Sequence, residues 1–193
     1  MKPTVPFTGM SQYKDDAHRA QAEEFMLELG RFAIEFERVC EAMRHTTIII
    51  FHSEGLKHQG LSQVVIGGKA SAELQVLVGA LFSELRARFD DDDRKAVRLV
   101  LKDIKELTES RNEVLHTAWQ FGQGTREFEM MAVAIRPTTA QNKGAVPEPH
   151  GLTPSYLREL SQFAKKQQVM LARLQTCILQ KGFCPAKELG KPA

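Results

Sequence analysis

TPSYLRELSQFAKKQQVMLARLQTCILQKG, residues Thr153–Gly182, has the pattern of one long helix with two defined ends. Thr153 can cap the first backbone amides, and Pro154 suits the first helical position because an N–H would have no partner there. Gly182 is typical of a residue that ends a helix. Between these ends, apolar residues recur at helical spacing: Leu157, Leu160, Phe163, Val169, Leu171, Leu174 and Ile178. The stripe predicts a helix that buries one face.

Three further helices are expected before this one. The first spans about Asp16–Ser53, where apolar residues recur at helical spacing. Its end, TTIIIF at 46–51, is rich in branched side chains, so a strand is the main alternative there. EGLKHQG at 54–60 predicts a turn, and VVIGGK at 64–69 breaks the next apolar run before a second helix over about Ala70–Phe89. The third begins near Asp92 or Asp93, because an aspartate there can cap free amides, and it ends around SRNEVLH.

The segment between the third and fourth helices has a different pattern. WQFGQGTREFEMMAVAIRPTT, residues 119–139, has a Gly-Gln-Gly turn and then a partly alternating apolar run that reaches a proline, which predicts a short β-hairpin. TAQNKGAVPEPHG, residues 139–151, is rich in Pro, Gly and polar residues and predicts a loop. The expected fold class is therefore all-α, a four-helix-bundle-like domain with a short β-hairpin and loop excursion between its third and fourth helices.

Length and composition fit one domain over 1–193, with its core at about 16–182 and flexible tails at 1–14 and 183–193. A chain of 193 residues with 42% hydrophobic residues can build one sizeable core. The net charge of +2 excludes a strong overall field for nucleic acid or membranes, although a local basic groove stays open. Three widely spaced cysteines and the absence of a long apolar run predict a soluble, cytoplasmic protein without cofactor or metal.

The stretch SRNEVLH, residues 110–116, concentrates polar side chains near the end of the third helix. Asn112 and His116 are four residues apart and share a helix face, while Arg111 lies on a neighbouring face but is long enough to reach the same cleft. Arginine matches phosphate oxygens, histidine exchanges protons near neutral pH, and asparagine can orient the histidine or bind an oxygen. These residues suit phosphodiester chemistry without a metal. They also suit the negative end of a helix dipole, so a solvated helix end is an open alternative.

The other polar groups have simpler interpretations. The run Asp90–Asp93 lacks the spacing of a calcium loop and favours helix capping. His45 and His52 are seven residues apart without ligand partners at suitable spacing, which favours surface positions over a metal site. No histidine adjoins any cysteine, so Cys40, Cys177 and Cys184 are expected to be structural thiols.

The segment SRNEVLHTAW resembles the signature of the HEPN family of helical-bundle proteins. Members carry an Arg-x4-6-His motif near the end of a core helix, commonly with Asn, Asp or His directly after the arginine. Arg111 matches the arginine, Asn112 the polar position and His116 the histidine, with four residues between. Trp119 and the excursion that follows also resemble one branch of bacterial HEPN proteins.

The resemblance implies a metal-independent endoribonuclease, often a toxin or phage-defence effector, that acts as a homodimer with two motifs facing one cleft. His116 would be the general acid or base for attack by the ribose 2′-hydroxyl, Arg111 would hold the scissile phosphate, and Asn112 would support the site. For a toxin, a cognate antitoxin is a further partner. Ala118 stands where one subgroup has a modified tyrosine, so regulation by that modification is not expected.

Two other classes of function stay open. One is a non-catalytic helical module in which the same groove binds a nucleotide, nucleic acid or a partner protein. The other is a structural bundle in which Arg111 only caps a helix or pairs with Glu109 or Glu113. In an enzyme or a binding module, Arg111 and His116 are expected to line an open groove close to a two-fold axis. In a structural bundle, they are expected to be buried in internal pairs or isolated on an exposed face.

Overall fold

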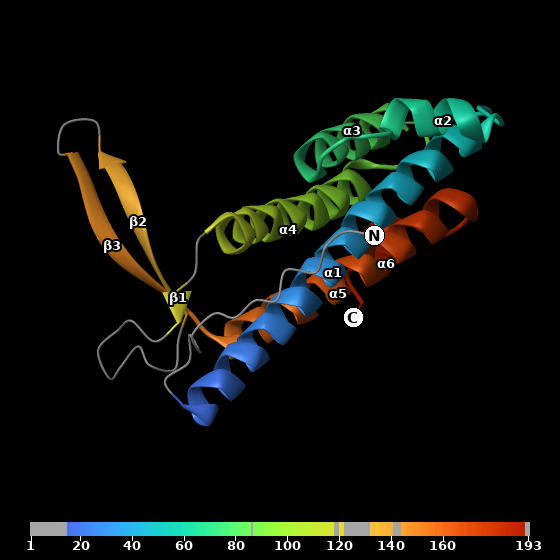
Figure 1. The fold of residues 1–193 in the computed structure, drawn as a ribbon. Coiled ribbons are helices and arrows are strands. Elements are labelled where there is room, and N and C mark those ends of the chain that lie inside the picture. Colours follow the sequence, from blue (N-terminus) through green and yellow to red (C-terminus); the bar gives the residue numbers. More distant parts are fainter. Residues whose placement is uncertain (1–14, 86, 118–119, 122–131, 141–143, 192–193) are drawn as a thin grey trace, which may run out of the picture. The chain divides into compact units, whose positions relative to one another are not determined.

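The computed structural model describes residues 15–85, 87–117, 120–121, 132–140 and 144–191 of the chain (Figure 1). This part of the chain is mostly helical, in agreement with the predicted all-α class. Its helices are α1 (Asp16–Ser53), α2 (Gln59–Ile66), α3 (Ser71–Glu84), α4 (Asp91–His116), α5 (Pro154–Leu179) and α6 (Pro185–Leu189). Its strands, which lie between α4 and α5 in the sequence, are β1 (Gln120–Phe121), β2 (Ala132–Ala140) and β3 (Gly144–Leu152).

The described backbone forms two compact units. The hairpin unit comprises the described residues of Met1–Gly30 and Thr117–Leu157, and the bundle unit comprises those of Arg31–His116 and Arg158–Ala193. The division falls inside α1 and near the start of α5, so both helices contribute to both units. The single domain over 1–193 stays a prediction.

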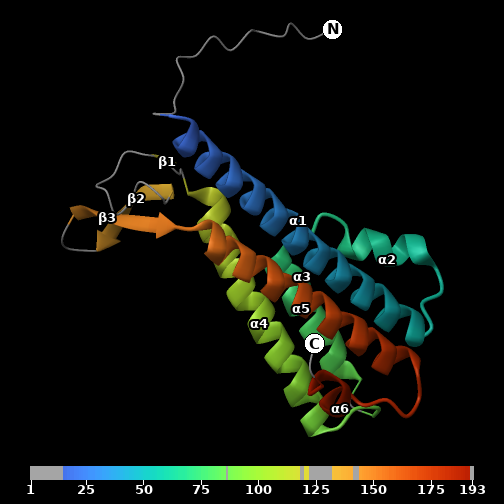
Figure 2. The same cartoon turned by 90° about the horizontal axis from the view of Figure 1, so that it is seen from below.

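In the bundle unit, α3, α4 and the parts of α1 and α5 that belong to it run alongside one another (Figures 1 and 2). They enclose an apolar core to which all four contribute. A cluster in this core consists of Ile49, Ile50, Phe82, Leu85, Phe89, Val97, Leu174, Cys177 and Ile178. The rings of Phe82 and Phe89 stack with their centroids 4.8 Å apart. Each helix therefore buries most of the apolar stripe that its sequence pattern predicts, but Val169 of the predicted α5 stripe is 41% exposed.

The branched segment TTIIIF is helical, so the strand alternative was wrong. Thr46 and Thr47 are fully buried in α1. Their hydroxyls donate to backbone carbonyls one turn earlier, Thr46 to Ala42 at 2.8 Å and Thr47 to Met43 at 3.1 Å. Gln175 on α5 also donates to Thr46 Oγ1 at 3.1 Å. Because each hydroxyl has a partner, the helix buries these side chains without unpaired polar atoms.

The turn expected at residues 54–60 is shorter than predicted, because α2 begins at Gln59. His58 caps this helix, and its Nδ1 accepts a hydrogen bond from Leu61 N at 3.3 Å. The next helix, α3, ends at Glu84 and not at Phe89 as predicted. Leu85 and Phe89 are both buried in the core cluster, and the chain turns there to place them. Tertiary packing thus ends α3 before its apolar pattern does.

The flexible tail predicted from residue 183 was wrong for Pro185–Leu189, which form α6 and pack against α4. Asp93 of α4 is 4% exposed, and its Oδ1 accepts a hydrogen bond from Ala186 N at 2.8 Å. Arg173 of α5 donates to the carbonyl of Lys191 at 2.7 Å. These contacts hold the end of the chain on the bundle. The tail predicted at 1–14 lies outside the described residues.

An aspartate caps α4, as the sequence predicts. Asp90 Oδ1 accepts a hydrogen bond from Asp93 N at 2.9 Å, and α4 begins at Asp91, one residue before the expected start. Asp91–Asp93 fill the first turn, where negative charge favours the positive end of the helix dipole. The acidic run therefore stabilises the start of the helix that carries Arg111 and His116.

In the hairpin unit, β1, β2 and β3 form an antiparallel sheet in that order. The loop predicted over 139–151 was wrong, because β3 occupies Gly144–Leu152 and pairs with β2 along its length. Pro147 and Pro149 lie on this strand, opposite Pro137 and Ile135. Both strands accommodate prolines at these positions, because β3 is an edge strand and, among the described residues, β1 pairs with β2 only at Ala132 and Val133. The predicted Gly-Gln-Gly turn lies outside the described residues.

We expect Leu107→Ala to lower the free energy of unfolding by about 2–5 kcal/mol, because the side chain is fully buried in α4 and its loss leaves a cavity. Urea denaturation followed by circular dichroism measures the change. Leu99→Ala is the matched control on the same helix, since Leu99 is 57% exposed, and its effect should stay below about 0.5 kcal/mol. Equal effects of the two substitutions would contradict the packing described for α4.

Glu35 joins α1 to α5 through its carboxylate. Gln168 donates to Glu35 Oε2 at 2.9 Å, Arg38 donates to Oε1 at 2.8 Å, and Lys165 lies 3.9 Å from Oε1. The hydrogen bond from Gln168 is the main reason that the pKa of Glu35 lies below its ordinary value, and the two positive charges lower it further. The folded protein therefore stabilises the ionised carboxylate.

A folded-state pKa below the unfolded value gives stability that is present above the unfolded pKa and is lost as pH falls through the folded pKa. We therefore expect Glu35→Gln to lower Tm at pH 7 by a few degrees, about 0.5–1 kcal/mol, and the difference from wild type to vanish as the solution is acidified below pH 4.5. Thermal unfolding of both proteins between pH 7 and values below pH 4.5 measures the difference in Tm. Glu41→Gln is the control, because Glu41 is 74% exposed. A difference that is independent of pH would contradict the role of the charge.

Candidate functional site

The last turns of α4 carry Arg111, Asn112 and His116, and α4 ends at His116. This agrees with the predicted position of the motif at the close of a core helix. Val114 is buried on the inner face of the same turns and anchors them to the bundle. Arg111 is half-buried, whereas Asn112 and His116 are exposed. The helix therefore holds three polar groups at a firmly packed end, with two of them open to solvent.

The structure brings all three predicted side chains together. Arg111 Nη1 lies 3.1 Å from His116 Nε2 and 3.2 Å from Asn112 Oδ1. A guanidinium can only donate, so His116 Nε2 accepts and the neutral ring carries its proton on Nδ1. Arg111 starts on a neighbouring helix face, as expected, and its length closes the gap to His116. The lone pair of Nε2 and a positive charge thus lie side by side.

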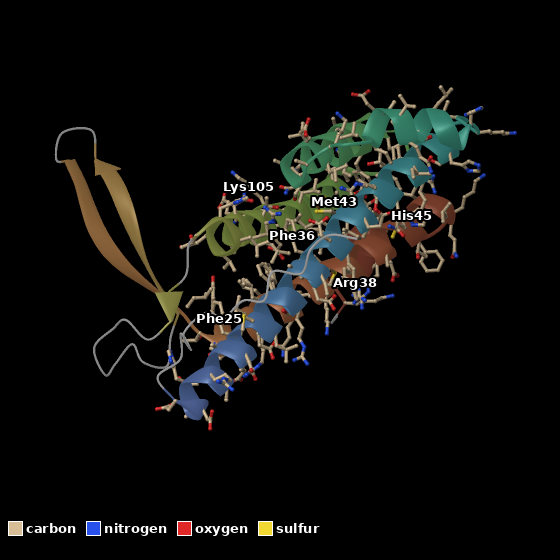
Figure 3. The ribbon with its side chains drawn as sticks, viewed as in Figure 1. Phe25, Phe36, Arg38, Met43, His45 and Lys105 are labelled. Atoms are coloured by element: carbon tan, nitrogen blue, oxygen red, sulfur yellow. The ribbon has the colours of Figure 1, made fainter. Side chains whose placement is uncertain are left out.

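The aromatic ring of Phe36 on α1 packs against the guanidinium of Arg111. Its central carbon lies 5.6 Å from the centroid of the Phe36 ring, a cation–π arrangement. Phe36 is 3% exposed, and Figure 3 shows it on the part of α1 that faces α4. Arg111 Nε is buried and has no hydrogen-bond partner within the described residues. The arginine is therefore held in place while one of its donors stays unsatisfied.

The ion pairs predicted by the purely structural reading of Arg111 do not form within the described residues. Instead, Glu109 Oε1 lies 3.9 Å from Lys105 Nζ. Neither Glu109 nor Glu113 pairs with Arg111 in this part of the chain. A half-buried arginine whose partners are neutral keeps its full charge. That charge favours an anion near the end of α4.

A pocket of about 210 Å³ adjoins Arg111 between α1, α3 and α4. Side chains from α1, the start of α3 and the end of α4 line it: Phe36, Glu37, Cys40, Arg44, Ala70, Ser71, Ala72, Thr108, Arg111 and Asn112. The sequence pattern predicted only Arg111 and Asn112 among these. Arg44 and Ser71 could not have been found in this way, because they lie on separate helices at no fixed spacing from the motif.

Hydrogen bonds between α3 and α4 fix the hydroxyl groups of this pocket. Ser71 Oγ lies 2.8 Å from Thr108 Oγ1, and Gln75 Nε2 donates to Thr108 Oγ1 at 2.8 Å. Thr108 also donates to the carbonyl of Ile104, one turn earlier in α4. Thr108 precedes Arg111 by three residues and so lies on nearly the same helix face. The network therefore fixes α3 against the turn of α4 that carries the arginine.

The cysteines occupy positions that fit structural thiols. Burial raises the pKa of the Cys40 thiol and raises the pKa of Cys177 to about 11. Both side chains are buried, so the nucleophilic thiolate is disfavoured at neutral pH. His45 and His52 are exposed on α1. In the described part of the chain, no three potential metal ligands cluster. Trp119 and Ala118 lie outside the described residues.

No family model, no curated protein sequence and no solved structure matches the chain. Among the described residues, no helix combines the length and the apolar character that crossing a membrane requires. A function for this chain is therefore proposed from the chemistry and geometry of Arg111, Asn112 and His116.

Proposed function

We propose that the chain is a metal-independent endoribonuclease of HEPN type, with Arg111, Asn112 and His116 at its active site. The observation that carries this proposal is the contact of 3.1 Å between Arg111 Nη1 and His116 Nε2 at the exposed end of α4. It places a proton acceptor beside a positive charge that has no carboxylate partner among the described residues. Cleavage of a phosphodiester needs both groups.

In the proposed reaction, the ribose 2′-hydroxyl attacks the neighbouring phosphorus. His116 Nε2 takes the proton of that hydroxyl, the bond from phosphorus to the 5′-oxygen breaks, and the leaving 5′-oxygen takes up a proton. Arg111 neutralises the charge that develops on the phosphate oxygens. Asn112, which accepts a hydrogen bond from Arg111, orients the guanidinium. The products are a 2′,3′-cyclic phosphate and a 5′-hydroxyl end.

The reaction needs a base at the attacking oxygen and an acid at the leaving oxygen. We propose that a homodimer supplies both, with the His116 side chains of two copies facing one cleft. A metal-independent ribonuclease of this kind would act in the cytoplasm as a toxin or phage-defence effector, with a cognate antitoxin as a partner where it is a toxin. These roles extend the resemblance of SRNEVLHTAW to the HEPN motif.

Incubation of the protein with RNA in EDTA tests the proposed activity. We expect cleavage that leaves 2′,3′-cyclic phosphate ends, and no cleavage of a matched oligonucleotide with a 2′-deoxy sugar at the mapped cleavage position. The matched substrate differs only in the attacking oxygen. Absence of RNA cleavage, cleavage that requires Mg²⁺, or equal cleavage of the deoxy substrate would contradict the proposal.

The second candidate is a non-catalytic helical module that binds a nucleotide, nucleic acid or a partner protein with the same residues. The pocket beside Arg111 favours this candidate, because it offers a binding site that does not depend on the reactivity of His116. Retention of RNA in a mobility-shift assay without any cleavage would favour it over the ribonuclease.

A further inference from the structure

The pocket beside Arg111 contains a second arginine that the proposed reaction does not use. Arg44 of α1 and Arg111 of α4 both line it, and the only carboxylate in its lining is that of Glu37. Arg44 also pairs with Glu41 at 3.3 Å, but the Glu41 side chain is 74% exposed, and an exposed pair of this kind contributes little. The lining of this pocket therefore carries a net positive charge.

The first residues of α3 add hydrogen-bond donors to the same wall. Ala70, Ser71 and Ala72 line the pocket, and Ala70 occupies the N-cap position, where its methyl group cannot accept a hydrogen bond. The Ala70 N–H already donates to Glu73 Oε2 at 2.9 Å, whereas the backbone amides of Ser71 and Ala72 have no partner within the helix. The Ser71 hydroxyl at the same place donates to Thr108 Oγ1 at 2.8 Å, because the proton of Thr108 is donated to Ile104, so this hydroxyl fixes the wall and is not a donor to a ligand. Two guanidinium groups and the backbone amides at the start of a helix are groups that bind phosphate oxygens.

The size of the pocket limits what it can hold. Its volume of about 210 Å³ is below the range of about 300–1,000 Å³ that is usual for sites enclosing a whole small molecule. A single phosphate group fits this space better than a complete nucleotide. The guanidinium of Arg111 belongs both to this pocket and to the contact with His116, so a phosphate bound here lies next to the proposed reaction centre.

We propose that this pocket binds one phosphate of the RNA backbone beside the scissile phosphate, with Arg44 as its principal ligand. The proposal rests on the proposed ribonuclease function and adds a subsite to it. Arg44 contacts a phosphate that does not react, so it contributes equally to binding of the substrate and of the transition state. Its loss raises KM and leaves kcat nearly unchanged. Free phosphate shares the same chemistry and is the other source of a ligand.

Binding of inorganic phosphate tests the pocket without any cleavage. Isothermal titration at fixed ionic strength should detect binding to wild type, a loss of about 10- to 100-fold in affinity in Arg44→Gln, and partial recovery in Arg44→Lys. Arg98→Gln is the matched control, because it removes the same charge from an exposed position on α4 outside the pocket. Circular dichroism confirms that each variant folds. Equal affinity in wild type and Arg44→Gln would overturn the pocket as a phosphate site.

Kinetics of RNA cleavage then distinguish the two sources of phosphate. We expect Arg44→Gln to raise KM about 10- to 100-fold with kcat within about threefold of wild type, and Arg98→Gln to change neither by that amount. If phosphate binding depends on Arg44 but KM does not, the pocket takes free phosphate and the backbone subsite is overturned. If wild type cleaves no RNA, the proposed function and the subsite both fail, while the titration still decides whether the pocket binds phosphate.

Discussion

His116→Ala is expected to lower the rate of RNA cleavage by about 100- to 10,000-fold, while binding of RNA persists. Among Arg111, Asn112 and His116, the substitution removes the group that can take a proton from the 2′-hydroxyl at neutral pH, since Arg111 and Asn112 cannot act as bases. It leaves the positive charge of Arg111 in place. The effect should therefore fall on kcat and not on the affinity for RNA.

Two matched controls separate this role from general damage to the protein. His45→Ala and His52→Ala remove exposed histidines of α1, away from the motif, and should leave the rate unchanged. Because His116 is exposed at a helix end, His116→Ala should also keep the Tm of wild type within a few degrees. Single-turnover kinetics, with RNA binding measured by fluorescence anisotropy, provide both readouts. A rate of cleavage in His116→Ala close to that of wild type would refute the catalytic role.

Arg111→Ala is expected to reduce kcat/KM by about 100- to 1,000-fold, because the charge on the phosphate oxygens then develops without compensation. Arg111→Lys should recover only part of this loss. An ammonium group keeps the charge, but it lacks the planar fork that matches phosphate oxygens and the flat face that lies over the ring of Phe36. The arginine is therefore required for its shape as well as for its charge.

Arg98→Ala and Arg98→Lys are the matched controls for the two Arg111 variants, because they change the same groups at an exposed position of the same helix. Neither should alter kcat/KM by more than about threefold, given the small energies of exposed charges. Cleavage by Arg111→Lys at the wild-type rate would show that a point charge suffices, which would remove the role assigned to the fork and to Phe36.

The sequence predicted the long elements of this fold because their apolar residues repeat over many turns. α1, α4 and α5 each present a stripe long enough to outweigh local preferences, and even the branched TTIIIF segment follows the helix that contains it. Short elements lack such a stripe. α2 has eight residues with Gly60 among them, and α6 depends on a hydrogen bond to Asp93, which is distant in the sequence. Contacts of this kind cannot be deduced from periodicity.

The same distinction applies to the candidate site. Arg111, Asn112 and His116 lie on one helix, so their spacing alone indicated that they could meet. Phe36 and Arg44 come from α1, and their approach to Arg111 depends on how α1 packs against α4. From the sequence pattern alone, a phenylalanine in an apolar stripe is predicted to be a core residue. Its second role, as a platform for the guanidinium, follows from tertiary structure.

The hydrogen bond from Arg111 to His116 also governs the protein before any RNA is bound. The lone pair of Nε2 is occupied by a donor at 3.1 Å, so the imidazole is unavailable both as a base and as a nucleophile toward reactive small molecules. In the proposed reaction, a phosphate that attracts the guanidinium of Arg111 releases this lone pair when the RNA binds. The same arginine then covers the base in the free protein and uncovers it in the complex.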